Sequence, residues 1–141
     1  MSTRKAKKED ALGIGLLLGQ LNYPVEEAFI TDQLIRLLNH EDHLILVYEL
    51  ENEIVGFLSA HFIPQIALSG DFGIISYFAV DSSFRSRGIG KELEETYVNL
   101  ARERKCDRIQ VHCNFKRTEA HKFYERYGYA ESPKYFSKGL Q

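Results

Sequence analysis

The sequence predicts an α/β protein of the α+β kind, with residues 1–141 forming one domain in which helices flank a mixed, mostly antiparallel sheet. Three observations support this fold class. Apolar runs rich in β-branched and aromatic residues alternate with stretches of helical period. Two neighbouring runs are separated by only three polar residues, which is typical of a hairpin. Strand–helix–strand units near the C-terminus predict at least one parallel pair, so the expected order is β-α-α-β-β-β-α-β-α-β.

The N-terminal part of the chain predicts a short edge strand at residues 3–8 and then two helices. Asp10 is the expected N-cap of the first helix, which runs to about Leu21. Pro24 suits the first turn of the second helix, which is expected over residues 25–39. The apolar stripe expected on the second helix consists of Ala28, Leu34, Ile35, Leu37 and Leu38.

The rest of the chain alternates predicted strands and helices. Runs at residues 44–50 and 54–63 flank a polar turn and predict the hairpin. A loop at 64–71 leads to a strand at 73–80 that is rich in Ile, Tyr, Phe and Val. The remaining expected elements are a helix over 88–105, a strand over 108–113, a helix over 118–127 that Gly128 stops, and a strand over 135–137.

Composition narrows the classes of function. The formal net charge of −2 provides no strong overall attraction to nucleic acid. No run of apolar residues is long enough for a transmembrane helix, and the N-terminus lacks the apolar region of a secretion signal. Two cysteines, Cys106 and Cys113, do not form a disulfide framework or a metal set. We therefore expect a cytoplasmic protein with reduced thiols, with no metal and with neither nucleic acid nor membrane as a partner.

The turn that joins the strand at 73–80 to the helix at 88–105 carries the strongest functional signal. Free N–H groups at the start of a helix, together with the helix dipole, form a site for phosphate oxygens. Gly88 and Gly90 let the backbone approach a ligand closely. Arg85, Arg87 and Lys91 add positive charge, and an arginine can bind a phosphate through two parallel hydrogen bonds. The turn therefore suits a pyrophosphate.

Other glycine motifs do not fit this turn. A Walker A loop requires Ser or Thr after Gly-Lys, but Glu92 follows Gly90-Lys91. A dinucleotide-binding fingerprint requires a third glycine where this chain has Leu93. Considered alone, an ordinary connection into a helix explains the glycines equally well, so both interpretations stay open at this point.

Two motifs in the expected order make the chain resemble the GNAT acyltransferase family. That family carries Arg/Gln-x-x-Gly-x-Gly/Ala between its fourth strand and the next helix, and here Arg85-Ser86-Arg87-Gly88-Ile89-Gly90 follows Phe78-Ala79-Val80-Asp81. The resemblance extends over nearly the whole chain, and the C-terminal segment is similar to aminoalkylphosphonate N-acetyltransferases and their small bacterial relatives. The second motif, similar to the closing strand and helix of the family, consists of Asn114, Ala120, His121, Phe123, Tyr124, Gly128 and Tyr129.

The resemblance implies an N-acetyltransferase that moves an acetyl group from acetyl-CoA to a primary amine of a small molecule by direct attack. It implies that Tyr124 is the general acid, because a phenol of pKa about 10 can protonate a departing thiolate of pKa about 8.5. Backbone groups of Phe78 and Val80 would bind the pantetheine arm. The full set of implied cofactor-binding residues is Phe78, Ala79, Val80, Arg85, Ser86, Arg87, Gly88, Ile89, Gly90, Lys91 and Asn114.

The general base and the acceptor stay open. Many relatives have a glutamate where this chain has Tyr77, so Asp71, His61 and His112 are the alternative bases, acting directly or through water. The family selects its acceptor with the first two helices and with the loop before the fourth strand. A protein N-terminal or lysine acetyltransferase and a CoA-binding module without catalysis are the alternative functions. Relatives are often homodimers, which leaves a homodimer open for this chain.

Overall fold

The computed structural model describes residues 2–111, 118–131 and 136–140, and it divides into two units, residues 1–111 and 112–141. Among these described residues, the first unit contains a five-stranded sheet, three α-helices and two short 3-10 helices, and the second unit contains one α-helix. In chain order the elements are β1 (Ser2–Lys5), η1 (Lys8–Asp10), α1 (Ala11–Gln20), α2 (Glu27–Leu38), β2 (His43–Leu50), β3 (Glu53–Ile63), β4 (Phe72–Val80), η2 (Ser82–Phe84), α3 (Ile89–Glu103), β5 (Arg108–Val111) and α4 (Thr118–Arg126).

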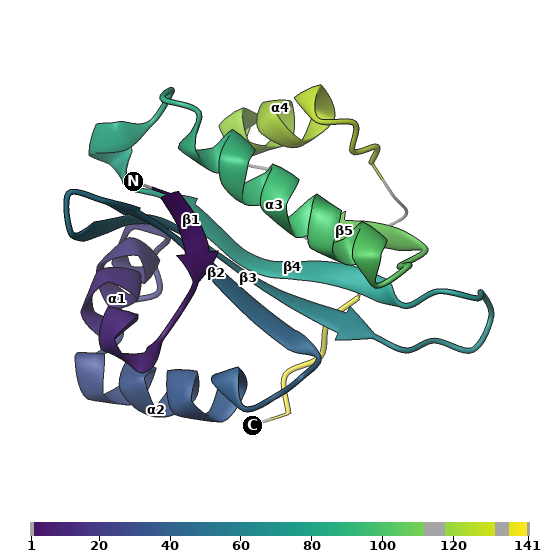
Figure 1. Ribbon diagram of the computed structural model, residues 1–141, viewed down its shortest axis with the longest axis horizontal. Helices are drawn as coiled ribbons and strands as arrows, with labels where there is room; N and C mark the ends of the chain where they lie inside the picture. Colours follow the sequence, from purple (N-terminus) through teal and green to yellow (C-terminus); the bar gives the residue numbers. More distant parts are fainter. Residues whose placement is uncertain (1, 112–117, 132–135, 141) are drawn as a thin grey trace. The chain divides into compact units, whose positions relative to one another are not determined.

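The sheet has the strand order β1-β2-β3-β4-β5 (Figure 1). The first three pairs are antiparallel and the β4–β5 pair is parallel, which confirms the predicted mixed, mostly antiparallel sheet. The predicted hairpin is formed by β2 and β3. Its turn residues Glu51 and Asn52 have φ angles of 51° and 66°, and two such left-handed residues match the twist of the flanking strands.

Helices cover both faces of the sheet, α1 and α2 on one and α3 on the other (Figure 1). Because side chains along a strand alternate between the two faces, the sheet contributes to two cores. On one side Val47 packs with Leu17 of α1. On the other side Leu58 packs with Leu93 and Tyr97 of α3, and all three are fully buried. The burial of one stripe of α3 agrees with the predicted amphipathic helix.

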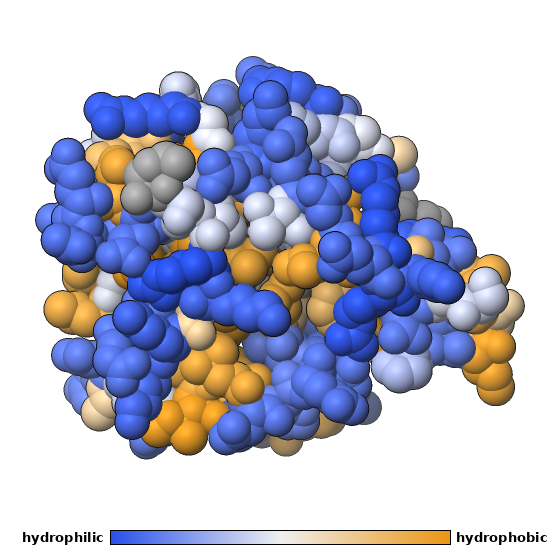
Figure 2. Space-filling model, viewed as in Figure 1, coloured by the Kyte–Doolittle hydropathy of each residue, from blue (hydrophilic) through white to orange (hydrophobic). Residues whose placement is uncertain are grey.

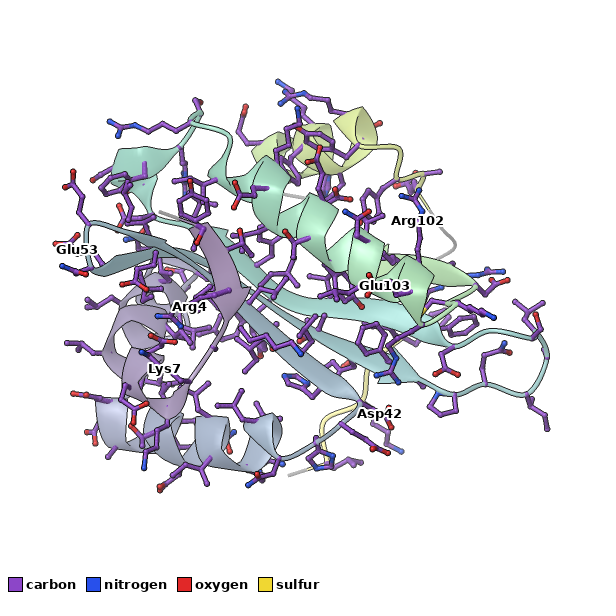
Figure 3. All side chains as sticks on the ribbon, viewed as in Figure 1. Arg4, Lys7, Asp42, Glu53, Arg102 and Glu103 are labelled. Carbon is purple, nitrogen blue, oxygen red and sulfur yellow. The ribbon has the colours of Figure 1, made fainter. Side chains whose placement is uncertain are left out.

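Asp10 is not the side-chain N-cap that the sequence predicts for α1. Its carboxylate is only 6% exposed and accepts two hydrogen bonds of 2.9 Å from the guanidinium of Arg4. It also accepts the backbone N–H of Lys7 at 2.9 Å, and Arg4 and Lys7 both lie beside α1 in Figure 3. The chain bends into η1 to bring these groups together, so β1 ends three residues earlier than predicted.

The second helix begins at Glu27, so the prediction that Pro24 lies in its first turn is wrong. Its buried residues are Ile30 and Leu34, one helical turn apart. The predicted apolar stripe includes two residues that do not face the sheet, because Ile35 and Leu38 are 46% and 38% exposed. The face of α2 that meets the sheet is therefore narrower than the apolar composition of the helix suggests.

The loop between β3 and β4 projects from the sheet and has a hydrophobic tip, visible in orange at the right of Figure 2. Ile66 at this tip is fully exposed. The side chain of Gln65 holds the loop in place, since its Oε1 accepts the N–H groups of Ala67 and Leu68 at 2.8 Å. The predicted loop at 64–71 is confirmed.

The C-terminal elements agree with the predictions in part. The strand at 108–113 is observed as Arg108–Val111, and residues 112 and 113 lie outside the described residues. Helix α4 ends as expected, with Gly128 at a φ of 91° and a 3.0 Å hydrogen bond from the N–H of Tyr129 to the carbonyl of Tyr124. The strand predicted at 135–137 is not formed by the described residues, because 136 and 137 have no regular structure and Tyr135 lies outside them.

Within residues 2–111, 118–131 and 136–140, no helix is long and apolar enough to cross a membrane. In the same ranges no three His, Cys, Asp or Glu side chains lie together as a metal site. Cys106 is a free, partly buried thiol, and burial raises its pKa above the ordinary value. Cys113 lies outside the described residues.

Candidate active site

The turn between β4 and α3 is a strand, a tight turn and a helix in succession, as the sequence predicts. Ser86 and Gly88 have φ angles of 65° and 81°, so the chain twice enters the left-handed region within three residues. Gly88 is the N-cap residue of α3, and no side chain caps this helix. The first turn of α3, beginning at Ile89, therefore presents backbone N–H groups and the positive end of the helix dipole. The acidic residue of that turn, Glu92, accepts hydrogen bonds from the N–H and the hydroxyl of Thr3 at 3.1 and 2.6 Å.

Three cations surround this helix start. Arg85, Arg87 and Lys91 are exposed, and none of them forms an ion pair with another residue in the described part of the chain. The guanidinium of Arg87 lies 5.1 Å from the ring centroid of Phe84, which orients it beside the turn. Cations next to helix N–H groups are an arrangement that suits a di-anionic group such as a pyrophosphate.

Helix α1 holds the same turn from the other side of the sheet edge. The Gln20 side chain donates to Asp81 Oδ2 at 3.2 Å and accepts the N–H of Ser82 at 3.0 Å. Asp81 in turn accepts the N–H of Ser83 at 2.8 Å, and its own N–H donates to the carbonyl of Val55 at 2.8 Å. The turn is thus fixed to both α1 and β3. Gln20 lies more than 60 residues away in sequence, so no local pattern could have identified it.

A β-bulge interrupts β4 next to the predicted cofactor-binding strand. Ser59 of β3 pairs with Tyr77, but its neighbour Ala60 pairs with Ile75, which leaves Ser76 as the extra residue. Before the bulge, β4 pairs with β5 over Phe72–Ile75. The segment Phe78–Val80 lies after the bulge, beyond the β5 pairing of the described residues. The predicted pantetheine-binding strand therefore follows the point where β4 changes its alignment.

Polar side chains cross three strands beside this bulge, on the face that α1 and α2 cover. His43 Nδ1 lies 3.0 Å from Nδ1 of His61, and His43 Nε2 lies 3.1 Å from the hydroxyl of Ser59. The hydroxyl of Ser76 donates to the carbonyl of Ser59 at 3.0 Å and lies 3.5 Å from the Ser59 hydroxyl. Burial, reinforced by the nearby His61, lowers the pKa of His43 to about 4, and burial also lowers the pKa of His61.

His61 is one of the alternative bases predicted from the sequence, whereas His43 and Ser59 were not predicted. The signal was present in the predicted hairpin, because equal parity along β3 puts residues 59 and 61 on one face. Only the register of the hairpin, which pairs His43 directly with His61, shows that a third polar residue joins them.

Of the other positions considered for the base, Tyr77 adjoins this group, because it pairs with Ser59 across β3 and β4. Tyr77, which occupies the usual glutamate position, is 41% exposed and meets the ring of Tyr23 edge-on at 5.4 Å. Asp71 directly precedes β4, at the end of the strand opposite to the β4–α3 turn. Its carboxylate lies 3.9 Å from the guanidinium of Arg104. The same guanidinium donates a hydrogen bond to Asp42, which is labelled in Figure 3. His112, like Asn114 of the predicted cofactor set, lies outside the described residues.

Tyr124 lies in the second unit, on α4. Its ring is half-buried and packs edge-on against Phe123 at 5.6 Å and against Tyr129 at 5.5 Å. These contacts fix the orientation of the ring on its own helix. The structure thus brings the residues of the β4–α3 turn together within the first unit and describes Tyr124 within the second.

Comparison with known proteins agrees with this architecture. Residues 16–129 match the model of the acetyltransferase (GNAT) family. The aminoalkylphosphonate N-acetyltransferase of Salmonella typhimurium is 31% identical over 142 residues, which cover 97% of this chain and 90% of that protein.

Solved structures give the same result. A GNAT family acetyltransferase from Staphylococcus aureus is 25% identical with a TM-score of 0.84, over 99% of this chain and 100% of that one. Glucosamine-6-phosphate N-acetyltransferase from Arabidopsis thaliana is 26% identical with a TM-score of 0.86, over 99% and 98% of the two chains. The chain therefore belongs to the acetyltransferase (GNAT) family and is an N-acetyltransferase.

Proposed function

We propose that the protein transfers the acetyl group of acetyl-CoA to a primary amine of a small molecule, by direct attack of the amine on the thioester. The observation that carries this proposal is the turn before α3, where a helix start without a side-chain cap meets three cations that form no ion pair with any described residue. CoA carries a pyrophosphate, which is the group that such a turn suits. Membership of a family that uses acetyl-CoA as cosubstrate supports the same assignment.

In this proposal the turn and the strand before it bind the cosubstrate. Ser86, Arg87, Gly88, Gly90 and Lys91 hold the pyrophosphate through backbone N–H groups and positive charge, with Arg85 and Ile89 at the edges of the same turn. The strand Phe78–Val80, with Ala79 at its centre, binds the pantetheine arm through its backbone. Asn114 contacts the arm from the chain that follows β5.

Tyr124 is proposed as the general acid. The departing CoA thiolate has a pKa of about 8.5 and becomes a better leaving group when a hydroxyl protonates it. A backbone N–H near Val80 would polarise the thioester carbonyl as negative charge develops on its oxygen. The amine attacks in its neutral form, so a proton must leave it before or during the attack.

The acceptor class follows from the Salmonella relative, which is named for acetylating aminoalkylphosphonates. We propose a small polar amine of that kind as the acceptor of this chain. The matched residues 16–129 extend across both units, which supports treating residues 1–141 as one catalytic domain. A homodimer and a cytoplasmic location are part of the same proposal.

The test is release of CoA thiol from acetyl-CoA in the presence of 2-aminoethylphosphonate, with other small amines and peptides with a free N-terminus in parallel. We expect turnover with the aminoalkylphosphonate and none with the peptides. Turnover with peptides alone would replace the proposed acceptor by a protein N-terminus. Binding of CoA without turnover on any amine would favour a non-catalytic CoA-binding module.

Tyr124→Phe tests the general acid, with Tyr127→Phe, one residue beyond the end of α4, as the matched control. Loss of a general acid is expected to lower kcat about 100-fold while the KM for acetyl-CoA stays unchanged. The control variant should keep wild-type kcat. If Tyr124→Phe also keeps wild-type turnover, the proposed proton donor is wrong although the transfer reaction stands.

A further inference from the structure

Resting on the proposed acetyl transfer, we propose that Ser76, Ser59, His43 and His61 form a proton relay that takes the proton from the acceptor amine. This relay replaces the carboxylate base that β4 lacks at Tyr77. The relay runs across β4, β3 and β2 on the face covered by α1 and α2. The base of this enzyme is accordingly a pair of histidines on two strands that do not carry the cofactor-binding motif.

The relay is continuous in space. Ser76 lies 3.5 Å from the Ser59 hydroxyl, the Ser59 hydroxyl lies 3.1 Å from His43 Nε2, and His43 Nδ1 lies 3.0 Å from His61 Nδ1. The Ser76 hydroxyl donates to the Ser59 carbonyl at 3.0 Å in this structure, so a rotation of that hydroxyl completes the first link. Ser59 is only 7% exposed, which keeps water from replacing the middle of the relay.

The outer end of the relay lies where the thioester is expected. A pantetheine arm that starts at the pyrophosphate turn and follows Val80 and Phe78 reaches the bulge at Ser76 next. From Val80 to Ser76 the strand covers about 13 Å, at about 3.3 Å per residue. The bulge turns the extra residue, Ser76, toward Ser59 rather than into the ladder with β5.

The proton balance closes without a further reactant. In the starting state His43 carries its proton on Nδ1 and donates it to His61 Nδ1, so His43 Nε2 is free to accept from Ser59. The amine gives one proton to Ser76, Ser76 gives one to Ser59, Ser59 gives one to His43 Nε2, and His43 Nδ1 gives one to His61. Both hydroxyls and His43 end neutral, and the positive charge has moved from the nitrogen of the amine to the His61 imidazolium.

Because His43 and His61 are weak bases in this environment, they pass a proton on and do not retain it. The nitrogen of the amine becomes more acidic as it bonds to the acetyl carbon, which drives its proton into the relay. A buried imidazole does not hold the proton, and the partly exposed His61 returns it to solvent. Arg36 of α2 and His40 influence His43 electrostatically. The charged residues that line a cavity together with His43 are Lys5, Glu41, Glu103 and Arg104.

The experiment compares the pH dependence of kcat for 2-aminoethylphosphonate in wild type, Ser59→Ala and His43→Gln. The two substitutions break the middle of the relay in different ways and change volume little. We expect each to lower kcat about 100-fold at pH 7, with the deficit shrinking below about tenfold near pH 9.5, where solvent takes the proton. The KM for acetyl-CoA and the melting temperature should stay at wild-type values.

His40→Gln is the matched control, because this neighbouring histidine influences His43 electrostatically and its hydrogen bond to His43 is a backbone bond that glutamine keeps, from the His43 N–H to the His40 carbonyl at 3.2 Å. It should keep kcat within about twofold of wild type, since salt screens the charge of an exposed side chain. A deficit in Ser59→Ala and His43→Gln that is equal at every pH would indicate a structural role and overturn the relay. Wild-type profiles in both variants would also overturn it, with acetyl transfer intact. No turnover by the wild type on any amine would instead refute the proposed function, and the relay with it.

Discussion

Two glycines of α1, two positions apart, are expected to respond in opposite ways to alanine. A Cβ at Gly13 would lie 2.7 Å from Cβ of Ile54 and 3.0 Å from its Cγ1, because α1 packs closely on β3 there. A Cβ at Gly15 would meet only Cγ1 of Ile30 at 3.9 Å, an ordinary contact. Both positions lie inside the helix, so their intrinsic helix propensities are equal and packing decides the difference.

The size of the effect can be worked out from these contacts. Replacing an interior glycine by alanine stabilises a helix by about 0.5 to 1 kcal/mol. Forcing a methyl group into a filled site costs about 1 to 3 kcal/mol. The free energy of unfolding should therefore rise by about 1 kcal/mol in Gly15→Ala and fall by about 1 kcal/mol in Gly13→Ala. For a chain of this size each kcal/mol corresponds to roughly 4 °C in Tm.

The assay is urea and thermal unfolding of both variants, followed by the KM for acetyl-CoA. Gly13→Ala should also raise this KM, because α1 must move away from β3 and Gln20 at its end holds the turn through Asp81. Gly15→Ala should leave the KM unchanged. If both variants are stabilised, or both destabilised to the same degree, the close approach of α1 to Ile54 does not govern the packing of this helix.

Two further predictions concern charge. Replacing Arg87 and Lys91 together by alanine should raise the KM for acetyl-CoA roughly tenfold while kcat is retained. Arg102→Ala, at the other end of α3, is the control and should leave this KM unchanged. Equal effects of the two changes on the KM would argue against the turn as the pyrophosphate site. Burial favours protonation of Asp10, but hydrogen bonds from Arg4 and Lys7 outweigh it and hold its pKa below the ordinary 3.8. Asp10 therefore stabilises the fold fully above that value and loses this contribution as pH falls through its folded pKa. Asp10→Asn should lower the free energy of unfolding, measured in urea, by about 2 kcal/mol at pH 7 and by progressively less in acid. The control variant Glu9→Gln should show no such loss. A loss of stability in Asp10→Asn that is the same at every pH would contradict this account.

Elements that depend on near neighbours in the chain were predictable from the amino-acid pattern. Alternation and β-branched composition predicted the β2–β3 hairpin and β4, and helical period predicted α3, since these patterns express which face of each element is buried. Glycines at 88 and 128 predicted where α3 begins and α4 ends, because both adopt the left-handed conformation that glycine permits. The turn between β4 and α3 was predictable for the same local reason.

Features that join residues distant in sequence became visible in the folded chain. Asp10 could not be distinguished from a helix cap until the fold brought Arg4 to its carboxylate. The bulge at Ser76 and the contact of His43 with His61 depend on strand register, which a single sequence specifies only weakly. A pattern reports how a segment is buried, whereas register and close packing depend on which segment lies opposite. That is why the phosphate-binding turn was visible in the sequence and the proposed path of the proton was not.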